Sequence, residues 1–441
     1  MKNSDPASNR RRFLKTSTAT AALVTVPHLA HAAKANEKIV MGIIGPGGMG
    51  MNHVRGFADA DNVEVAYVCD VDEKRLASAA KEVARRGRAP KAVKDMRTIF
   101  EDKNVDAVAI ATPDHWHTPA SILACEAGKH VYVEKPVSHN VREGRLLVEA
   151  AERNKVVVQH GTQSRSTAPI IEAMERLHSG VIGEVLVAKA WNSQRRSSIG
   201  KSKPIDPPAH LDFDLWLGPA PKVPYRPNML HSIWRWWYDY GCGDIGNDGV
   251  HDLDIARWGL GTFGERHPNR IMAMGGKYFF DDDMQWPDTQ TVLYEYAPAR
   301  EGERPRQLIF EQRIWSPYVQ EGFENGNAFY GTKGMMLLGK RGGYKLYGER
   351  NKLIEDKPAG GPDLGAHHRN FLAAVRAEEA AHANALTAHL SSSLCHLGNI
   401  AIRTGRRLNF DPVKELVDGD EEANGLVGRE YRKHWGVPAG A

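Results

Sequence analysis

The stretch Gly45-Pro46-Gly47-Gly48-Met49-Gly50 decides the fold that this sequence predicts. It comes directly after the apolar run 39–44 and before 51–60, a segment compatible with a helix. In a G-x-G-x-x-G turn, the first glycine permits the tight turn, the second lets the backbone approach a pyrophosphate, and the third lets helix pack on strand. The unpaired N–H groups of the helix N-terminus then face the phosphates. We therefore expect a dinucleotide to contact Gly45, Gly47, Gly48, Met49 and Gly50.

A second apolar run, 63–69, ends on Asp70, which lies 20 residues beyond the last glycine of the turn. An acidic side chain at this place accepts hydrogen bonds from the adenine ribose, so Asp70 favours NAD as the cofactor. Lys74 and Arg75 follow closely and would reach a 2′-phosphate, which leaves NADP open.

Apolar runs alternate with helix-like segments through the first part of the chain. The strand candidates are 105–112, 131–133 and 156–159, and the helix candidates between them include 119–127 and 142–153. This alternation predicts an α/β fold in which helices cover both faces of a parallel sheet. We expect a Rossmann domain over residues 37–160.

The texture of the chain changes after Gly161. The strand candidates 185–191, 289–296 and 307–312 alternate apolar and polar residues, which is typical of a sheet with one buried face. We expect a second, substrate-binding domain over residues 161–441. Within it, the proline-rich segment 197–227 predicts a long ordered loop anchored by 213–217.

The N-terminus has the pattern of an export signal. Paired arginines, Arg10-Arg11-Arg12, precede Phe13-Leu14, a mild apolar stretch 19–26 and Ala30-His31-Ala32. This order is typical of a twin-arginine leader, so we predict that residues 1–32 are removed. The apolar stretch is too short for a bilayer, which needs about 20 apolar residues. We expect a periplasmic or otherwise exported protein, carried folded by the twin-arginine export machinery, with a tightly held cofactor because free nucleotide is scarce outside the inner membrane.

Charge and cysteine content exclude several classes of function. The chain has 58 basic and 54 acidic residues, and residues 1–32 hold five basic and one acidic, which leaves 53 of each. Such a balance gives no support for nucleic-acid binding, which requires a basic patch. The four cysteines are widely spaced and form no C-x-x-C pair, so the sequence indicates neither a zinc site nor a redox motif.

Two motifs follow strand candidates directly. The first is Thr112-Pro113-Asp114-His115-Trp116-His117 and the second is Glu134-Lys135-Pro136. Parallel strands leave a crevice at their carboxyl ends, so both motifs should lie beside the nicotinamide. Without a cysteine or carboxylate at ligand spacing, the histidines are assigned to cofactor or substrate contact and no metal is expected. The predicted cofactor contacts from these motifs are Thr112, Pro113, His117, Glu134 and Lys135.

Together with the segment 244–254, these motifs resemble the Gfo/Idh/MocA family, named for glucose/fructose oxidoreductase, inositol dehydrogenase and MocA. The resemblance implies a Rossmann domain followed by an α/β domain with an open, mostly antiparallel sheet that often forms oligomer contacts, hence a homo-oligomer. It also implies that Lys135 and His251 flank the substrate carbinol. An ammonium stabilises the developing alkoxide, and an imidazole takes the proton as hydride leaves.

The family commonly has an aspartate four residues before the histidine, where this chain has Asn247. An amide orients a neighbour but cannot relay a proton as a carboxylate does. We therefore expect Asn247 to join Lys135 and His251 as the catalytic group, with a carboxylate restored by Asp244, Asp248 or Asp254. The predicted substrate contacts are Gln163, Arg165, Trp234, Arg235 and Asp248. Most aromatic residues of 234–240 should serve packing, and some should stack on a sugar.

Three functions remain open, in decreasing order of support. The first is an exported NAD(P)-dependent oxidoreductase that transfers hydride to or from a secondary alcohol of a sugar, cyclitol or glycoside. The second is a glycosidase-like or lyase-like enzyme that works through a transient keto-sugar and regenerates its NAD in each turnover. The third is a non-catalytic sugar-binding protein that keeps the fold, which Lys135 and His251 argue against.

Overall fold

The run Ile39–Ile44 forms β1, a central strand of a six-stranded parallel sheet with the order β3-β2-β1-β4-β5-β6. The computed structural model describes residues 38–298, 300–316 and 318–441, so the predicted leader lies outside the described residues. The other strands of this sheet are β2 (Val63–Cys69), β3 (Lys91–Val93), β4 (Ala107–Ile110), β5 (His130–Val133) and β6 (Val158–His160). This strand order is that of a dinucleotide-binding Rossmann fold.

Helices cover both faces of the parallel sheet, which explains why β4 is apolar and buried throughout. On one face lie α1 (Gly48–Ala58) and α2 (Glu73–Ala84), and on the other α3 (Arg97–Glu101), α4 (Asp114–Glu126) and α5 (Val141–Asn154). Two of these helices begin at side-chain caps. Asp72 accepts from the N–H groups of Lys74 and Arg75 at the start of α2, and Asn140 accepts from that of Glu143 in α5.

The second sheet has ten strands in the order β14-β13-β12-β11-β7-β10-β9-β8-β15-β16. Only β7 and β10 pair in parallel, and the other neighbours are antiparallel. The strands are β7 (Val185–Asn192), β8 (Arg270–Gly276), β9 (Thr289–Tyr296), β10 (Arg306–Arg313), β11 (Asn325–Gly331), β12 (Met335–Gly339), β13 (Tyr344–Tyr347), β14 (Leu353–Lys357), β15 (Leu408–Asp411) and β16 (Leu416–Val417). A Rossmann domain followed by an open, mostly antiparallel sheet confirms the predicted fold class.

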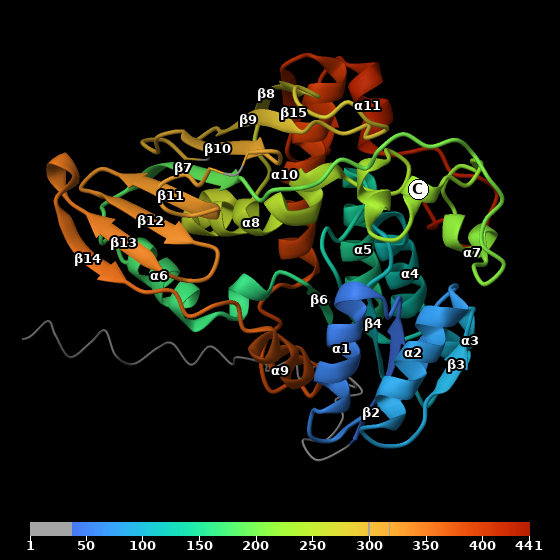
Figure 1. Ribbon diagram of the computed structural model, residues 1–441. Coiled ribbons are helices and arrows are strands. Elements are labelled where there is room, and N and C mark those ends of the chain that lie inside the picture. Colours follow the sequence, from blue (N-terminus) through green and yellow to red (C-terminus); the bar gives the residue numbers. More distant parts are fainter. Residues whose placement is uncertain (1–37, 299, 317) are drawn as a thin grey trace, which may run out of the picture. The chain divides into compact units, whose positions relative to one another are not determined.

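One face of the second sheet carries its core. The helices α6 (Ala168–His178), α8 (Val250–Gly259) and α10 (Ala385–Thr404) pack on this face, against Val292, Tyr294 and Phe310 (Figure 1). The alternation seen in the sequence has this cause, because residues 290, 292, 294 and 296 of β9 are buried and their neighbours are more exposed.

After β14 the chain returns to the Rossmann domain before it adds the last two strands of the second sheet. Helix α9 (Leu364–Val375) lies beside α1 in Figure 1, and its Phe371 meets the rings of Phe57 and Tyr132 edge-on. The last helix, α11 (Glu421–Val427), packs against α10. Because α9 completes the core on one face of the Rossmann sheet, residues after 161 pack against both sheets.

A long connection between β7 and α8 reaches the Rossmann domain, and we call its residues 205–240 the strap. It contains the short helix α7 (Phe213–Leu217), at the anchor expected from the sequence. Backbone hydrogen bonds join the strap to the end of β2: Asp212 N–H donates to Val71 O at 3.0 Å, and Glu73 N–H donates to His210 O at 3.0 Å. No helix of the described residues is long and apolar enough to cross a membrane.

Candidate functional site

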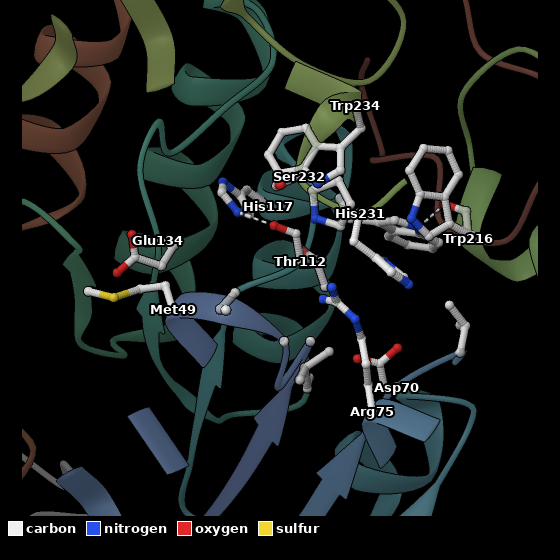
Figure 2. Close-up of a pocket in the computed structure, with 18 of the residues that line it drawn as sticks. Met49, Asp70, Arg75, Thr112, His117, Glu134, Trp216, His231, Ser232 and Trp234 are labelled. Atoms are coloured by element: carbon white, nitrogen blue, oxygen red, sulfur yellow. Dashed lines mark hydrogen bonds between the residues drawn. The ribbon is translucent and has the colours of Figure 1, made fainter. Parts of the chain in front are cut away.

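A cavity of about 510 Å³ lies at the carboxyl ends of the parallel strands. Its floor is made by the glycine turn after β1 and by the ends of β2, β4 and β5. The strap supplies the opposite wall, and Figure 2 shows Trp216, His231 and Trp234 across from Met49, Asp70 and Arg75. The cavity therefore lies where a Rossmann sheet binds its dinucleotide.

The glycine turn leaves room for a ligand to contact the protein backbone. Gly50 packs so closely on the turn that a Cβ there would lie 2.2 Å from the carbonyl oxygen of Gly45. A Cβ on Gly48, by contrast, would meet no protein atom within 4 Å. The space above Gly48 and the free N–H groups at the start of α1 fit a pyrophosphate.

Asp70, just after β2, and Arg75, in the first turn of α2, bring an acidic and a basic side chain to the same cavity. Asp70 lines it and accepts a hydrogen bond from Asp72 N–H at 2.9 Å, while burial raises the pKa of Asp70 to about 6. Arg75 lines the cavity beside Asp70 (Figure 2), whereas Lys74 lies outside the lining. The residues for a ribose contact are in place, and Arg75 is the one available to a 2′-phosphate.

His117 ties the two predicted motifs together. Its Nδ1 lies 2.6 Å from Pro136 O and its Nε2 lies 2.8 Å from Thr112 O. Both carbonyls belong to loops at the cavity, so the ring holds the end of β4 against the loop after β5. Thr112, Pro113 and His117 all line the cavity, as Figure 2 shows for Thr112 and His117.

Glu134 is buried in a hydrogen-bonded chain. Its Oε1 lies 3.0 Å from His53 Nε2, and His53 Nδ1 lies 2.9 Å from His368 Nε2. Gln163 Nε2 donates to the same Oε1 at 3.3 Å. Burial acts to raise the pKa of Glu134, but the hydrogen bond from His53 and the charge of Lys135 outweigh it and hold the pKa at about 2. The cavity therefore has a fixed carboxylate beside Lys135.

Lys135 points its ammonium at Asn247. Its Nζ donates a short hydrogen bond to Asn247 O and lies 3.4 Å from Asn247 Oδ1. Burial lowers the pKa of Lys135, against the charge of Glu134. Asn247 itself accepts from Arg235 Nε at 2.7 Å and donates to Asp244 Oδ1 at 2.8 Å. Asn247 lies behind the cavity wall as a hub for two cations.

His251 comes from the first turn of α8, after a π-helical turn, Ile245–Gly249, of the kind frequent at functional sites. It lines the cavity and is buried. Burial and the charges of Lys340 and Lys135 hold the pKa of His251 well below its usual range. Its Nδ1 is enclosed without a hydrogen-bond partner among the residues that the structure describes, which leaves Nε2 to meet a ligand. The ring is therefore neutral, with a nitrogen that is able to accept a hydrogen bond from a substrate hydroxyl.

Asp248 lines the cavity, but its carboxylate is engaged by the protein. Lys340, at the end of β12, makes a short ion pair with Oδ1, and Oδ2 receives Asn325 Nδ2 at 3.3 Å and Arg196 Nη2 at 3.4 Å. Burial acts to raise the pKa of Asp248, yet the charge of Lys340 outweighs it and keeps the carboxyl ionised.

The structure brings most predicted site residues to one cavity and leaves three outside its lining. The lining includes Gly45, Gly47, Gly48, Met49, Asp70, Thr112, Pro113, His117, Glu134, Lys135, Gln163, Trp234, Arg235, Asp248 and His251. Gly50 supports the turn, and Asn247 contacts Lys135. Arg165 is directed elsewhere: its Nε lies 2.8 Å from Asp254 Oδ2, and its guanidinium stacks on Trp258. This ion pair occupies both Arg165 and Asp254, so Asp254 does not restore a carboxylate beside His251.

Sequence reasoning did not single out several lining residues, and most of them belong to the strap. These are Leu215, Trp216, His231 and Ser232 of the strap, with Lys94 and Met96 of the Rossmann domain. The signal present in the sequence was the anchor 213–217 in a long polar segment. Of the aromatic residues in 234–240, only Trp234 lines the cavity, while Trp236 and Tyr240 pack in apolar clusters.

One group of potential metal ligands lies outside the cavity lining. His267, His389 and Glu415 bring ligand atoms within 4.8 Å of one another. Both Nε2 atoms lie within hydrogen-bond distance of Glu415 Oε1, at 2.9 and 2.7 Å, and Arg145 pairs with the same carboxylate. The arginine already balances the charge of Glu415, so hydrogen bonds account for this cluster.

Two family models match the chain. Residues 39–162 match the NAD-binding Rossmann fold of the Gfo/Idh/MocA oxidoreductase family, and residues 188–297 and 338–437 match the family's C-terminal alpha/beta domain. The family's Rossmann domain thus coincides with the sheet that carries the glycine turn.

Two individual relatives share 27–29% identity with this chain over part of their length. The chain is 29% identical over 210 residues to a "Glycosyl hydrolase family 109 protein 1" of Shewanella sp. (strain ANA-3), covering 41% of this chain and 45% of that protein. It is 27% identical over 254 residues to the "Levoglucosan dehydrogenase" of Pseudarthrobacter phenanthrenivorans, covering 54% and 57%. The chain spans about half the length of these relatives.

Solved structures share the fold at low identity. A levoglucosan dehydrogenase in complex with NADH has a TM-score of 0.65 at 17% identity and covers 84% of this chain and 98% of its own. The WlbA dehydrogenase from Bordetella pertussis, in complex with NADH and UDP-GlcNAcA, has a TM-score of 0.63 at 18% identity and covers 85% and 99%. With both family models matched, the chain belongs to the Gfo/Idh/MocA oxidoreductase family, whose N-terminal domain is an NAD-binding Rossmann fold.

Proposed function

We propose that this protein is an exported, NAD-dependent oxidoreductase that transfers hydride to or from a secondary alcohol of a carbohydrate. One observation supports this most strongly: Lys135 and His251 line the same cavity as the glycine turn. The proposal agrees with the relatives named levoglucosan dehydrogenase and with the sugar nucleotide bound to WlbA.

The residues of the chain have separate tasks in this reaction. NAD, when bound, supplies the acceptor or donor of hydride. The glycine turn and Asp70 would hold its pyrophosphate and ribose. Lys135 donates a hydrogen bond to the carbinol oxygen and stabilises negative charge there. His251 takes the hydroxyl proton at Nε2, because burial and two cations keep its ring neutral. Asn247 positions Lys135 and does not carry a proton.

Tight binding of the cofactor and export are parts of the same proposal. The twin-arginine pattern of residues 9–15 supports export, and it lies outside the described residues. The strap supports retention, because it lines the cavity opposite the glycine turn and is hydrogen-bonded to residues 71–73. An enzyme that keeps its cofactor would work where free nucleotide is scarce.

A homo-oligomer is also part of the proposal. The strand β8 exposes Met272 at 52% and Met274 at 76%, on the face of the second sheet away from its helices. Exposed apolar side chains on the sheet face opposite the helices favour a contact with another subunit.

A second candidate is a glycosidase-like or lyase-like enzyme that oxidises a ring hydroxyl, eliminates the aglycone and regenerates its NAD. The similarity to a glycosyl hydrolase family 109 protein favours it, and the same Lys135 and His251 would act. It differs from simple oxidation in its products, since aglycone leaves with no net change in cofactor.

The test is spectroscopic and uses the purified full chain. Mass spectrometry identifies any bound nucleotide, and absorbance follows the nicotinamide while sugars and glycosides are added. We expect bound NAD whose redox state changes with a carbohydrate, and a Lys135→Met variant that keeps nucleotide but loses at least about 100-fold in rate. The matched control is Lys74→Met, an exposed lysine outside the cavity, which should behave as the unmodified chain. Release of aglycone without net reduction of the nicotinamide would favour the second candidate. A protein without affinity for NAD or NADP would leave the non-catalytic sugar-binding protein.

A further inference from the structure

Two cations in the cavity wall have no carboxylate partner. Lys135 and Arg235 are partly buried, and neither forms an ion pair of 4.0 Å or shorter with any described residue. The neighbouring cations differ, since Lys340 pairs with Asp248, and Arg196 with Asp244 and Asp248.

The hydrogen bonds of these two cations go to neutral oxygens. Arg235 donates from Nε to Asn247 Oδ1 at 2.7 Å and from Nη1 to Ser232 O at 2.8 Å, and Lys135 donates to Asn247 as well. An amide oxygen satisfies an N–H group but brings no charge. The Asn247 hub therefore joins two positive groups without neutralising either.

The acids of the region are engaged elsewhere. Glu134 accepts from His53 and Gln163, Asp248 is held by Lys340, and Asp114 accepts from Cys242 N–H at 3.1 Å. None of them lies within 4.0 Å of the guanidinium of Arg235. A desolvated cation without a direct counter-charge costs free energy, and a bound anion removes that cost.

Arg235 is also oriented for such an anion. Its guanidinium lies over the ring of Trp234, 4.3 Å from the centroid, and this contact holds the group at the cavity. No hydrogen bond of the described residues engages its Nη2. A guanidinium with free N–H groups matches a carboxylate better than a hydroxyl.

We infer that the substrate is an acidic sugar, a uronate or aldonate, whose carboxylate binds Arg235 while its reacting hydroxyl lies at Lys135 and His251. This inference rests on the proposed function and names the substrate class of the same site. Arg235 is then the specificity-determining residue, and the neutral Asn247 is what leaves its charge free for the substrate.

The test compares sugars that differ only in the C6 group: D-glucuronate with D-glucose, and D-galacturonate with D-galactose. Quenching of tryptophan fluorescence reports binding to the purified full chain, and nicotinamide absorbance reports reaction. We expect at least one acid to bind about tenfold or more tightly than its neutral partner, a difference of about 1.4 kcal/mol. Arg235→Gln should abolish the preference, and Arg235→Lys should retain part of it.

Two further variants separate charge from structure. Asn247→Asp adds a counter-charge beside Arg235 and should also reduce the preference for acids. Arg195→Gln removes an exposed arginine outside the cavity lining and should leave the preference unchanged. Equal nucleotide content in all variants shows that each has folded.

Equal binding of acid and neutral sugars, or no binding of either acid, would overturn the inference. Reduction of the nicotinamide by a neutral sugar alone would overturn it and leave the proposed oxidoreductase standing. Only absence of nucleotide would remove both.

Discussion

Two glycines of the turn have different roles, one in folding and one in ligand binding. Gly50 lies against backbone, where a Cβ would be 2.2 Å from Gly45 O, and backbone cannot move aside cheaply. Gly48 faces open space at a φ of +40°, so an added methyl meets no protein atom there. The two positions should therefore respond differently to the same substitution.

We predict that Gly48→Ala folds but loses nucleotide, because its methyl occupies the place of the pyrophosphate. The positive φ should cost about 1 kcal/mol, a shift of a few degrees in Tm at most. Gly50→Ala should lower Tm clearly more and lose nucleotide as well.

Thermal unfolding and nucleotide content of the purified variants test this, with Gly87→Ala as the control, since Gly87 also has open space but an ordinary φ. A Gly48→Ala protein with full nucleotide content would show that the turn does not hold the phosphates.

At the scale of elements, helices α9 and α10 bury histidines that stay neutral. Burial lowers the pKa of His368 in α9 to about 2 and that of His396 in α10 to about 3. In the unfolded chain both titrate near 6.5. Between these values the unfolded state binds more protons than the native state, so stability rises with pH in this window and falls as the pH is lowered through it.

We expect Tm to fall progressively from pH 7 to pH 5. Below pH 6.5, each such histidine lowers the free energy of unfolding by up to about 1.4 kcal/mol per pH unit. His396→Gln should flatten the dependence of Tm on pH. The control His178→Gln removes an exposed histidine and should leave the dependence as it was. Constant stability across this range would contradict a neutral, buried set of histidines.

At the scale of the whole molecule, the C-terminal residues 429–441 fasten the strap to the Rossmann domain. Arg432 donates from its backbone N–H to Pro219 O at 3.0 Å and pairs with Asp214 at 2.7 Å, both in the strap. Trp435 packs on Trp116 of α4 at a ring distance of 5.3 Å. Trp116 in turn donates to Trp216 O at 3.0 Å, and both tryptophans line the cavity. The chain end (C in Figure 1) contacts α5, where Arg142 donates to Gly440 O at 3.1 Å.

This arrangement predicts that the C-terminal segment controls how firmly nucleotide is held. Arg432→Gln and Trp435→Ala should each accelerate loss of bound nucleotide about tenfold or more, because they free the strap that closes the cavity. Repeated dialysis followed by nucleotide analysis measures this.

Arg407→Gln, an exposed arginine before β15, is the matched control and should retain nucleotide. If the Arg432 and Trp435 variants both retained nucleotide, the hydrogen bonds between the strap and residues 71–73 would be sufficient to keep the cavity closed.

Local sequence patterns were enough to predict the Rossmann domain and the edge of its sheet where a ligand binds. The glycine turn, Asp70 and the motif at Lys135 are local patterns, since each depends on a strand end and the few residues after it. The fold class followed from periodicity, because burial on two faces or one face leaves a different pattern in each strand. The segment 244–254 identified His251 through resemblance to the family.

The surroundings of these groups depend on contacts that form when the chain folds. Lys340 reaches Asp248 from 92 residues away, and Trp216 lines the cavity from the short helix α7 of the strap. Arg165 was expected to contact the substrate, but its guanidinium forms an ion pair with the buried carboxylate of Asp254. Such pairings depend on contacts between distant segments, and neither spacing nor periodicity along the chain encodes which charged groups meet when the sheets pack.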